Sequence, residues 1–224
     1  MTVLLHLNGK AGRLEALHEA PSATRFAAIV CHPHPLFGGT MNNPATYRLA
    51  KALRSRGGAV LRFNFRGVGS SAGAHGNGRG EIEDAQIGLA WLAERHPELP
   101  LYASGFSFGA WVALEAGCHH PEVRGILCAG LALSLREMEL STAQSCPKPV
   151  AVIQGEHDRF GSPAEVQALL EGSAGPRRVS VVAGASHLFK EDSRALEREA
   201  TIAMDWLLPT EPRTNAPAQR GSDP

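Results

Sequence analysis

Residues 101–116 read LYASGFSFGAWVALEA. The apolar run Leu101–Ser104 predicts a short buried strand, and the residues from Phe108 to about Cys118 predict a helix. Between the two lies the pattern G-x-S-x-G, centred on Ser107. A tight turn from strand to helix presents a serine hydroxyl at the end of a sheet, so this setting predicts that Ser107 is a nucleophile. The alternative is that Ser107 only caps the helix.

The pattern G-x-S-x-G occurs a second time, centred on Ser71. This copy lies in a glycine-rich stretch with no helical pattern directly behind it, so we interpret Ser71 as an ordinary loop serine. Residues 67–72 also fit G-x-G-x-x-A, which alone suggests dinucleotide binding. Because no helix opens there, we interpret the stretch as a loop with tight turns and Arg66 as a structural hydrogen-bonding residue.

Strand-like and helix-like segments alternate on both sides of this stretch, which predicts a doubly wound, mostly parallel sheet of about seven to eight strands. Residues 1–208 are expected to form one such α/β domain, and the polar, proline-rich residues 209–224 a disordered tail. Residues 134–148 have a mixed pattern that predicts no element. The expected strands are 3–7, 13–18, 26–31, 59–65, 101–104, 123–129, 150–154 and 179–182, and the expected helices are 47–56, 81–95, 108–118, 164–170 and 195–207.

Partners for the serine follow two later strands. Ligand sites of such sheets lie beyond the carboxyl ends of the strands, and the hydrolase triad on this type of sheet runs in the order serine, acid, histidine. Asp158 follows one predicted strand and His187 follows the last one. Glu156 is the alternative acid, and we favour Asp158 because it lies further into its loop. The alternative for His187 is a surface histidine without a role.

Acyl transfer also needs two N–H donors for the oxyanion. The first is expected to be the main-chain N–H of Phe108, directly after the serine, and the second is expected in the loop after residues 26–31. In that loop Pro33 and Pro35 have no N–H, so we expect the main chain of His34 to donate. His32 and His34 form an H-x-H pair, but no further ligand follows at close spacing, so we expect no metal and no organic cofactor.

The composition of the chain indicates which binding partners and which compartment to expect. The 224 residues carry 22 Lys and Arg against 22 Asp and Glu, and this balance gives no reason to expect nucleic acid or an anionic membrane as a partner. The first residues lack the pattern of a signal peptide, and no apolar run has membrane-spanning length. The four cysteines show no metal or redox spacing, so we expect reduced thiols and a cytoplasmic protein.

Several blocks of the sequence together resemble a known family. HPHPLFGGTMNN, FNFRGVGSSAG, GFSFGA, QGEHD and GASHLF are similar to the small bacterial α/β-hydrolases related to dienelactone hydrolases and serine aminopeptidase-like hydrolases. The resemblance covers residues 26–208 and implies the triad Ser107, Asp158 and His187 on a compact core with little or no lid. Dienelactone hydrolases proper have a cysteine where this chain has Ser107, so the resemblance does not imply that this chain shares their substrate.

The expected activity is hydrolysis of carboxylic esters with short acyl groups, through an acyl-enzyme. Alternatives are hydrolysis of acyl-CoA or other thioesters, hydrolysis of peptide-like amides, and a non-catalytic binding protein on the same fold. A small-molecule substrate is the expected partner, and the chain is expected to be a monomer or a homodimer. The residues expected to line the substrate pocket are Leu36, Phe37, Leu133 and Met138.

Overall fold

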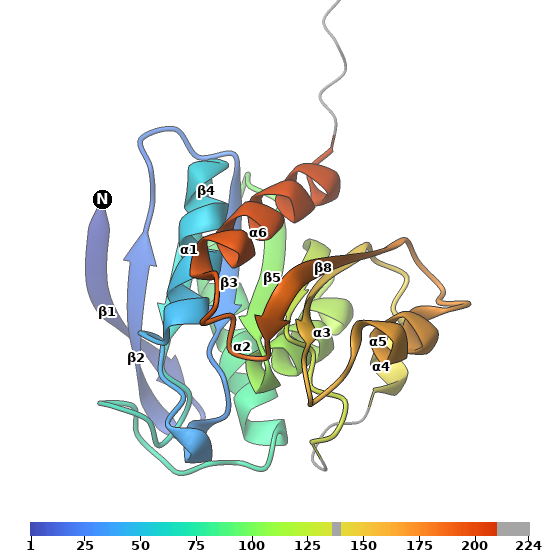
Figure 1. Ribbon diagram of the computed structural model, residues 1–224. Coiled ribbons are helices and arrows are strands. Elements are labelled where there is room, and N and C mark those ends of the chain that lie inside the picture. Colours follow the sequence, from blue (N-terminus) through green and yellow to red (C-terminus); the bar gives the residue numbers. More distant parts are fainter. Residues whose placement is uncertain (136–139, 210–224) are drawn as a thin grey trace, which may run out of the picture.

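The sheet of this protein has eight strands in the order β1-β2-β4-β3-β5-β6-β7-β8 (Figure 1). The computed structural model describes residues 1–135 and 140–209. From β4 to β8 the strands run parallel, while β1 and β2 form an antiparallel hairpin that joins the edge of β4. The strands are β1 (Thr2–Gly9), β2 (Gly12–Glu19), β3 (Phe26–Cys31), β4 (Gly58–Phe63), β5 (Leu101–Phe106), β6 (Val123–Ala129), β7 (Val150–His157) and β8 (Arg177–Ser186).

Helices cover both faces of the sheet, as predicted for a doubly wound fold (Figure 1). Helices α1 and α6 pack together on one face, and their apolar side chains share a core cluster with residues of the central strands. The opposite face is covered by α2, α3, α4 and α5, which contribute to the second cluster. The helices are α1 (Pro44–Ser55), α2 (Arg79–Arg95), α3 (Phe108–His119), α4 (Ser141–Ser145), α5 (Pro163–Leu170) and α6 (Ser193–Leu207).

Burial follows the position of each strand in the sheet. Every residue of β3, β4 and β5 is buried, because helices cover both faces there, and their sequences are accordingly apolar runs. Strands β1 and β8 lie at the edges and keep exposed residues. The prediction of β8 as residues 179–182 was too short at both ends, because the strand begins with two arginines and ends with the small residues 183–186, which do not continue the apolar pattern.

The chain reverses direction across the sheet between β3 and β5, and this point positions the site. From β3 the chain crosses to β4 on one side, and then returns past β3 to β5 on the other. The loops after these two neighbouring parallel strands therefore diverge and leave a crevice at their carboxyl ends. His32 directly follows β3 and Ser107 directly follows β5, so both residues lie at this crevice.

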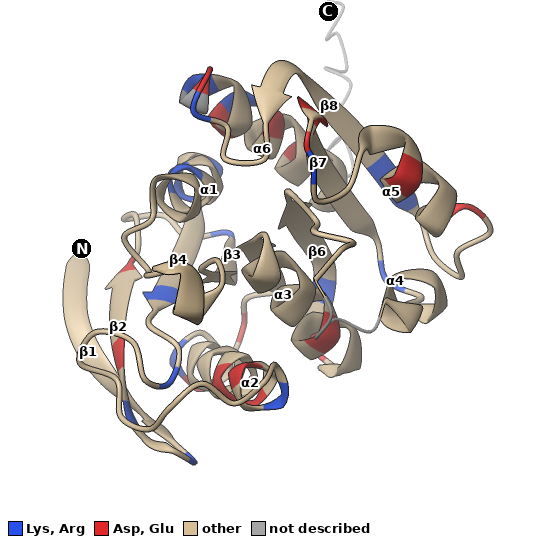
Figure 2. Cartoon of the chain, turned by 60° about the horizontal axis from the view of Figure 1, so that its bottom comes forward, with Lys and Arg blue, Asp and Glu red and all other residues tan. Residues whose placement is uncertain are grey.

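Other sequence-based expectations meet mixed outcomes. The unassigned segment 134–148 contains the short helix α4, while residues 136–139 lie outside the described residues. The predicted tail also lies outside them, apart from Pro209. All four cysteines are free thiols. Acidic and basic residues are interspersed around the molecule, with both signs on α2 (Figure 2).

Candidate active site

Three side chains meet at the carboxyl edge of the sheet. Ser107 occupies the turn between β5 and α3, Asp158 directly follows β7, and His187 directly follows β8. His187 Nε2 lies 2.9 Å from Ser107 Oγ, and His187 Nδ1 lies 2.8 Å from Asp158 Oδ2. All three side chains are buried. The structure thus brings together the three residues that the sequence selected from different loops.

The backbone of Ser107 is held in an unusual conformation. Its φ of 57° and ψ of −121° fall in a region that residues with a side chain rarely adopt, and such strain is typical of functional sites. The turn closes because its flanking glycines have no side chain. A Cβ at Gly105 would lie 2.0 Å from the carbonyl oxygen of Gly109, and one at Gly109 would lie 2.4 Å from the carbonyl oxygens of Cys31 and His32.

The carboxylate of Asp158 is fixed by more than the histidine. Its Oδ1 accepts from the main-chain N–H of Phe160 at 2.9 Å, and its Oδ2 accepts from Nε2 of Gln154 at 2.9 Å. The alternative acid, Glu156, instead accepts from the main-chain N–H of Gly184 at 2.7 Å. Of the two candidate acids, the one beside His187 is therefore Asp158.

Gln154 is a site residue that the sequence analysis missed. Its side chain is fully buried at the end of β7, and its Oε1 accepts from the N–H of Leu131 at 3.0 Å. Besides Asp158, its Nε2 donates to the carbonyl of Gly161 at 2.7 Å. One amide thus joins the β6 loop, the β7 loop and the carboxylate. A polar residue at the end of a predicted buried strand was the only available signal.

The imidazole of His187 lies between two aromatic rings. Its centroid is 5.3 Å from that of Phe106 and 4.7 Å from that of Phe160. With a proton on Nδ1 donated to Asp158, the Nε2 atom accepts from the hydroxyl of Ser107. This arrangement can remove a proton from the serine and hold the resulting imidazolium next to a carboxylate.

The two predicted oxyanion donors lie beside each other. Phe108 is the first residue of α3, so its N–H has no partner within the helix. His34 lies in the loop after β3, and its ring centroid is 4.7 Å from that of Phe108. The loop bends back on itself at Gly39, where a Cβ would lie 1.9 Å from the carbonyl oxygen of Pro33. His34 lines the pocket described below, and Phe108 is fully buried directly after Ser107, which lines it too. Binding of an oxyanion by the two main-chain N–H groups stays a prediction.

His32 supports this loop from inside the fold. Its Nδ1 lies 2.6 Å from the carbonyl oxygen of Pro33, and its Nε2 accepts from the main-chain N–H of Phe65 at 3.0 Å. Burial lowers the pKa of His32 to about 4, so the ring is neutral at physiological pH. In the other histidine of the H-x-H pair, His34, Nδ1 accepts from the main-chain N–H of Leu36 at 3.2 Å. Among residues 1–135 and 140–209, no cluster of three or more His, Cys, Asp or Glu side chains is suited to a metal ion.

The glycine-rich stretch after β4 has a structural role. Ser71 Oγ donates to the carbonyl of Asn64 at 2.7 Å and accepts from the N–H of Glu15 at 2.9 Å, so the second G-x-S-x-G serine ties β2 to the end of β4. Arg66 pairs with Asp84 of α2 at 2.7 Å, which confirms its prediction as a structural hydrogen-bonding residue.

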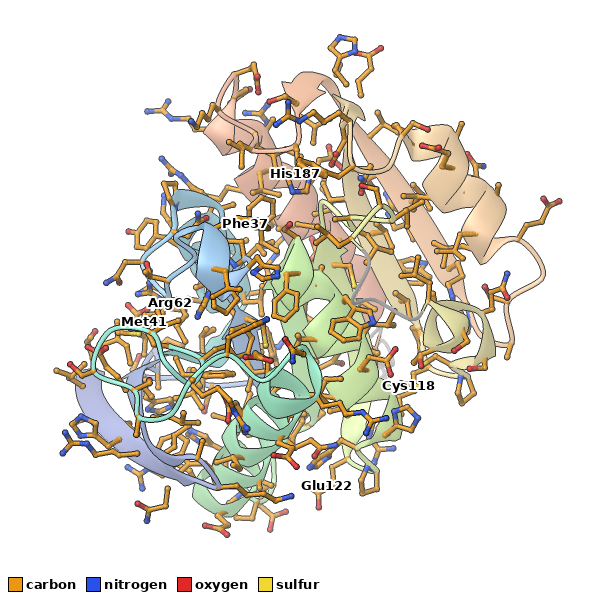
Figure 3. All side chains as sticks on the ribbon, turned by 90° about the horizontal axis from the view of Figure 1, so that it is seen from below. Phe37, Met41, Arg62, Cys118, Glu122 and His187 are labelled. Carbon is orange, nitrogen blue, oxygen red and sulfur yellow. The ribbon has the colours of Figure 1, made fainter. Side chains whose placement is uncertain are left out.

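A pocket of about 690 Å³ opens above these side chains. Phe37 and His187 line it from the β3 and β8 loops, and Figure 3 shows the two side chains close together. Residues of the β7 loop line it as well, and the sequence analysis did not foresee them. The full lining is Pro33, His34, Phe37, Gly38, Gly39, Asn43, Phe106, Ser107, Leu135, His157, Arg159, Phe160, Ser186, His187 and Leu188.

The structure places the four predicted pocket residues differently. Phe37 lines the pocket and Leu36 does not, although both side chains are largely exposed, at 79% and 67%. Leu133 also lies outside the lining, because its side chain packs against the core. Leu135, two residues further along the chain, lines the pocket where Leu133 was expected to. Met138 lies outside the described residues.

No helix in the described part of the chain is long and apolar enough to cross a membrane.

Comparison with known proteins agrees with the fold. A family model for an alpha/beta hydrolase domain matches residues 28–205. An uncharacterized protein of Rickettsia prowazekii is 35% identical over 194 residues, 83% of this chain and 82% of that protein. An alpha-beta serine hydrolase homologue from Coxiella burnetii has a TM-score of 0.83 at 31% identity, covering 89% of this chain and 96% of that one. A serine hydrolase without lid from Xanthomonas campestris has a TM-score of 0.85 at 31% identity, covering 94% and 97%.

Proposed function

The chain belongs to the α/β-hydrolase family, and from this we propose that it is a serine hydrolase that cleaves carboxylic esters. The observation that carries the proposal is the line of hydrogen bonds from Ser107 through His187 to Asp158 at the floor of the pocket. A serine hydroxyl is a weak nucleophile until a neighbouring base takes its proton, and this line supplies the base and orients it.

The proposed reaction has two halves. Ser107 Oγ attacks the ester carbonyl while His187 Nε2 takes its proton, and the N–H groups of Phe108 and His34 bind the oxyanion. As the intermediate collapses, His187 returns the proton to the leaving alcohol and an acyl-serine remains. Water then attacks the acyl group with His187 as base, and the acid and free serine are released. Asp158 keeps the His187 proton on Nδ1 and stabilises the imidazolium throughout.

The pocket supports small ester substrates. Its walls combine apolar side chains with the two glycines of the β3 loop, and no metal or organic cofactor takes part in the proposed steps. We propose a preference for short acyl groups, because the pocket of about 690 Å³ is bounded by the loops that follow the strands rather than by a separate cap domain. The free thiols and neutral charge balance also support a cytoplasmic enzyme.

Initial rates on p-nitrophenyl esters from acetate to decanoate, and on the matching acyl-CoA thioesters and p-nitroanilides, test the proposal. We expect the highest kcat/KM on acetate or butyrate esters, and loss of this activity in Ser107→Ala. Higher kcat/KM on thioesters or anilides would reassign the substrate. No hydrolysis of any substrate by the folded protein would favour a binding protein on this fold.

A further inference from the structure

Arg159 is a charged residue in the pocket lining with no part in the proposed chemistry. It directly follows Asp158, and its guanidinium carbon lies 5.1 Å from the centroid of the Phe160 ring. The Phe160 ring in turn lies 4.7 Å from that of His187. A guanidinium stacked on an aromatic face is held in place while its N–H groups stay available to a ligand. The positive charge of Arg159, an exposed residue, thus lies one aromatic ring away from the proposed catalytic base.

The platform under this charge is well anchored. Phe160 donates its main-chain N–H to Asp158 at 2.9 Å, and its carbonyl accepts from the N–H of Ser134 at 3.1 Å. Because the main-chain N–H and the main-chain carbonyl of Phe160 are both hydrogen-bonded, its ring keeps a defined position against His187. The guanidinium stacked on it is therefore directed by the same loop that supplies the acid.

Nearby carboxylates are engaged with other groups. Asp158 binds His187, and Glu156 accepts from the main-chain N–H of Gly184. Glu191 accepts from both the N–H and the hydroxyl of Ser186, which lowers its pKa. Within residues 1–135 and 140–209, no carboxylate lies within ion-pair distance of Arg159, and no Asp or Glu lines the pocket.

The position of this charge also separates the two ends of a substrate. His187 Nε2 returns its proton to the leaving alcohol, so that alcohol lies on the His187 side of Ser107. Arg159 and Phe160 lie on this side, while Phe37 and the glycines of the β3 loop form the other wall. The charge therefore faces the alcohol portion of the substrate.

We propose that the site selects esters whose alcohol portion carries an anionic group, which Arg159 binds. This inference rests on the proposed function and names its substrate class. A guanidinium binds a carboxylate or a phosphate with paired hydrogen bonds, and the aromatic and aliphatic side chains of the same pocket contact the rest of the molecule. Carboxylate and phosphate share this chemistry, and separate substrates distinguish them.

Matched phenyl acetates test the selection. We compare 4-acetoxybenzoate and 4-acetoxyphenyl phosphate with 4-acetoxybenzamide, which is neutral and has nearly the same shape as the benzoate. The wild-type protein is expected to show a kcat/KM about tenfold or more higher on at least one anion than on the amide, since hydrogen bonds to charged groups contribute on this scale. The anion with the higher kcat/KM shows whether the site selects a carboxylate or a phosphate. Equal or lower kcat/KM on both anions would overturn the inference.

Two variants separate Arg159 from general electrostatics. Arg159→Gln is expected to bring the anion-to-amide ratio close to one. Arg124→Gln, at an exposed position near the amino end of β6 and away from the site, is expected to keep the wild-type ratio. A preference that survives in folded Arg159→Gln would contradict the assignment.

Binding distinguishes failure of the inference from failure of the proposed function. In Ser107→Ala, titration calorimetry with the same three compounds measures selection without turnover. We expect the preferred anion to bind about tenfold more tightly than the amide, and this difference to disappear when Arg159→Gln is added. If the anion binds selectively but the wild-type protein hydrolyses none of the compounds, the anion site is supported and the esterase activity is contradicted. If the protein hydrolyses the compounds without charge selection, the esterase activity is supported and the anion site is contradicted.

Discussion

Gln154 and His187 converge on one oxygen of Asp158. Oδ2 of this carboxylate lies 2.9 Å from Gln154 Nε2 and 2.8 Å from His187 Nδ1. The other oxygen is bonded to a main-chain N–H. Gln154 and the main-chain N–H of Phe160 therefore hold the carboxylate in its orientation toward the imidazole. Gln154 acts here as a positioning residue, because it does not line the pocket.

Replacing Gln154 with leucine is expected to lower kcat about tenfold and leave KM within about twofold of wild type. The free energy of unfolding should fall by about 1–3 kcal/mol, because the N–H of Leu131 and the carbonyl of Gly161 lose their buried partner. Steady-state kinetics and urea unfolding measure both effects. Gln167→Leu, at an exposed position on α5, is the matched control. An unchanged kcat with lowered stability would restrict Gln154 to a structural role.

The choice between the two acids of the QGEHD block has a direct test. Asp158→Asn is expected to lower kcat by about 10³–10⁴-fold, since the amide no longer selects the proton position of His187. Glu156→Gln should stay within about twofold of wild type, because the Glu156 carboxylate bonds a main-chain N–H away from the imidazole. Both are isosteric changes measured on the same ester. The opposite ranking of the two variants would transfer the acid role to Glu156.

Acid sensitivity should follow from the buried His32. Burial lowers its pKa from 6.5 to about 4, so between these values the unfolded chain takes up a proton that the folded chain does not. The stabilisation is therefore complete above pH 6.5 and is lost as the pH falls toward 4, by about 3 kcal/mol in total. Urea unfolding at pH 4 to 7.5 measures this slope.

His32→Gln provides the comparison, because an amide can accept from Phe65 and donate to Pro33 without titrating. Its unfolding free energy should fall less steeply between pH 6.5 and 4 than that of the wild-type protein. Part of the slope remains, since burial also lowers the pKa of His18 to about 4. Identical slopes in the two proteins would show that His32 does not titrate as the structure implies.

The sequence predicts the elements and the strand-end positions of the three candidate catalytic residues from local signals, and their role as a triad stays a proposal. Buried parallel strands are apolar runs, and Ser107 and Asp158 directly follow strands of this kind, while His187 directly follows the edge strand β8. The antiparallel edge hairpin and the long β8 were less well defined, since edge strands alternate polar and apolar residues. The correct assignment of Ser71 as structural also came from its local setting, a loop without a following helix.

Contacts between distant segments were not predictable in the same way. The roles of Gln154 and His32 depend on residues of other loops, namely Asp158 and Phe65, which no local pattern connects to them. The side of a loop that an apolar residue faces is likewise set by the folded turn. Phe37 lines the pocket while Leu36, its neighbour, does not, although both side chains are largely exposed.

The most direct test of the nucleophile is covalent labelling of the intact protein with a fluorophosphonate, followed by peptide mass spectrometry. The probe reacts with activated serines, so the wild-type protein should gain one adduct on the peptide that contains Ser107. Ser71→Ala should label like wild type, because its hydroxyl only bridges β2 and the end of β4. Folded Ser107→Ala should gain no adduct. An adduct that persists in Ser107→Ala, or one found on Ser71, would contradict the account.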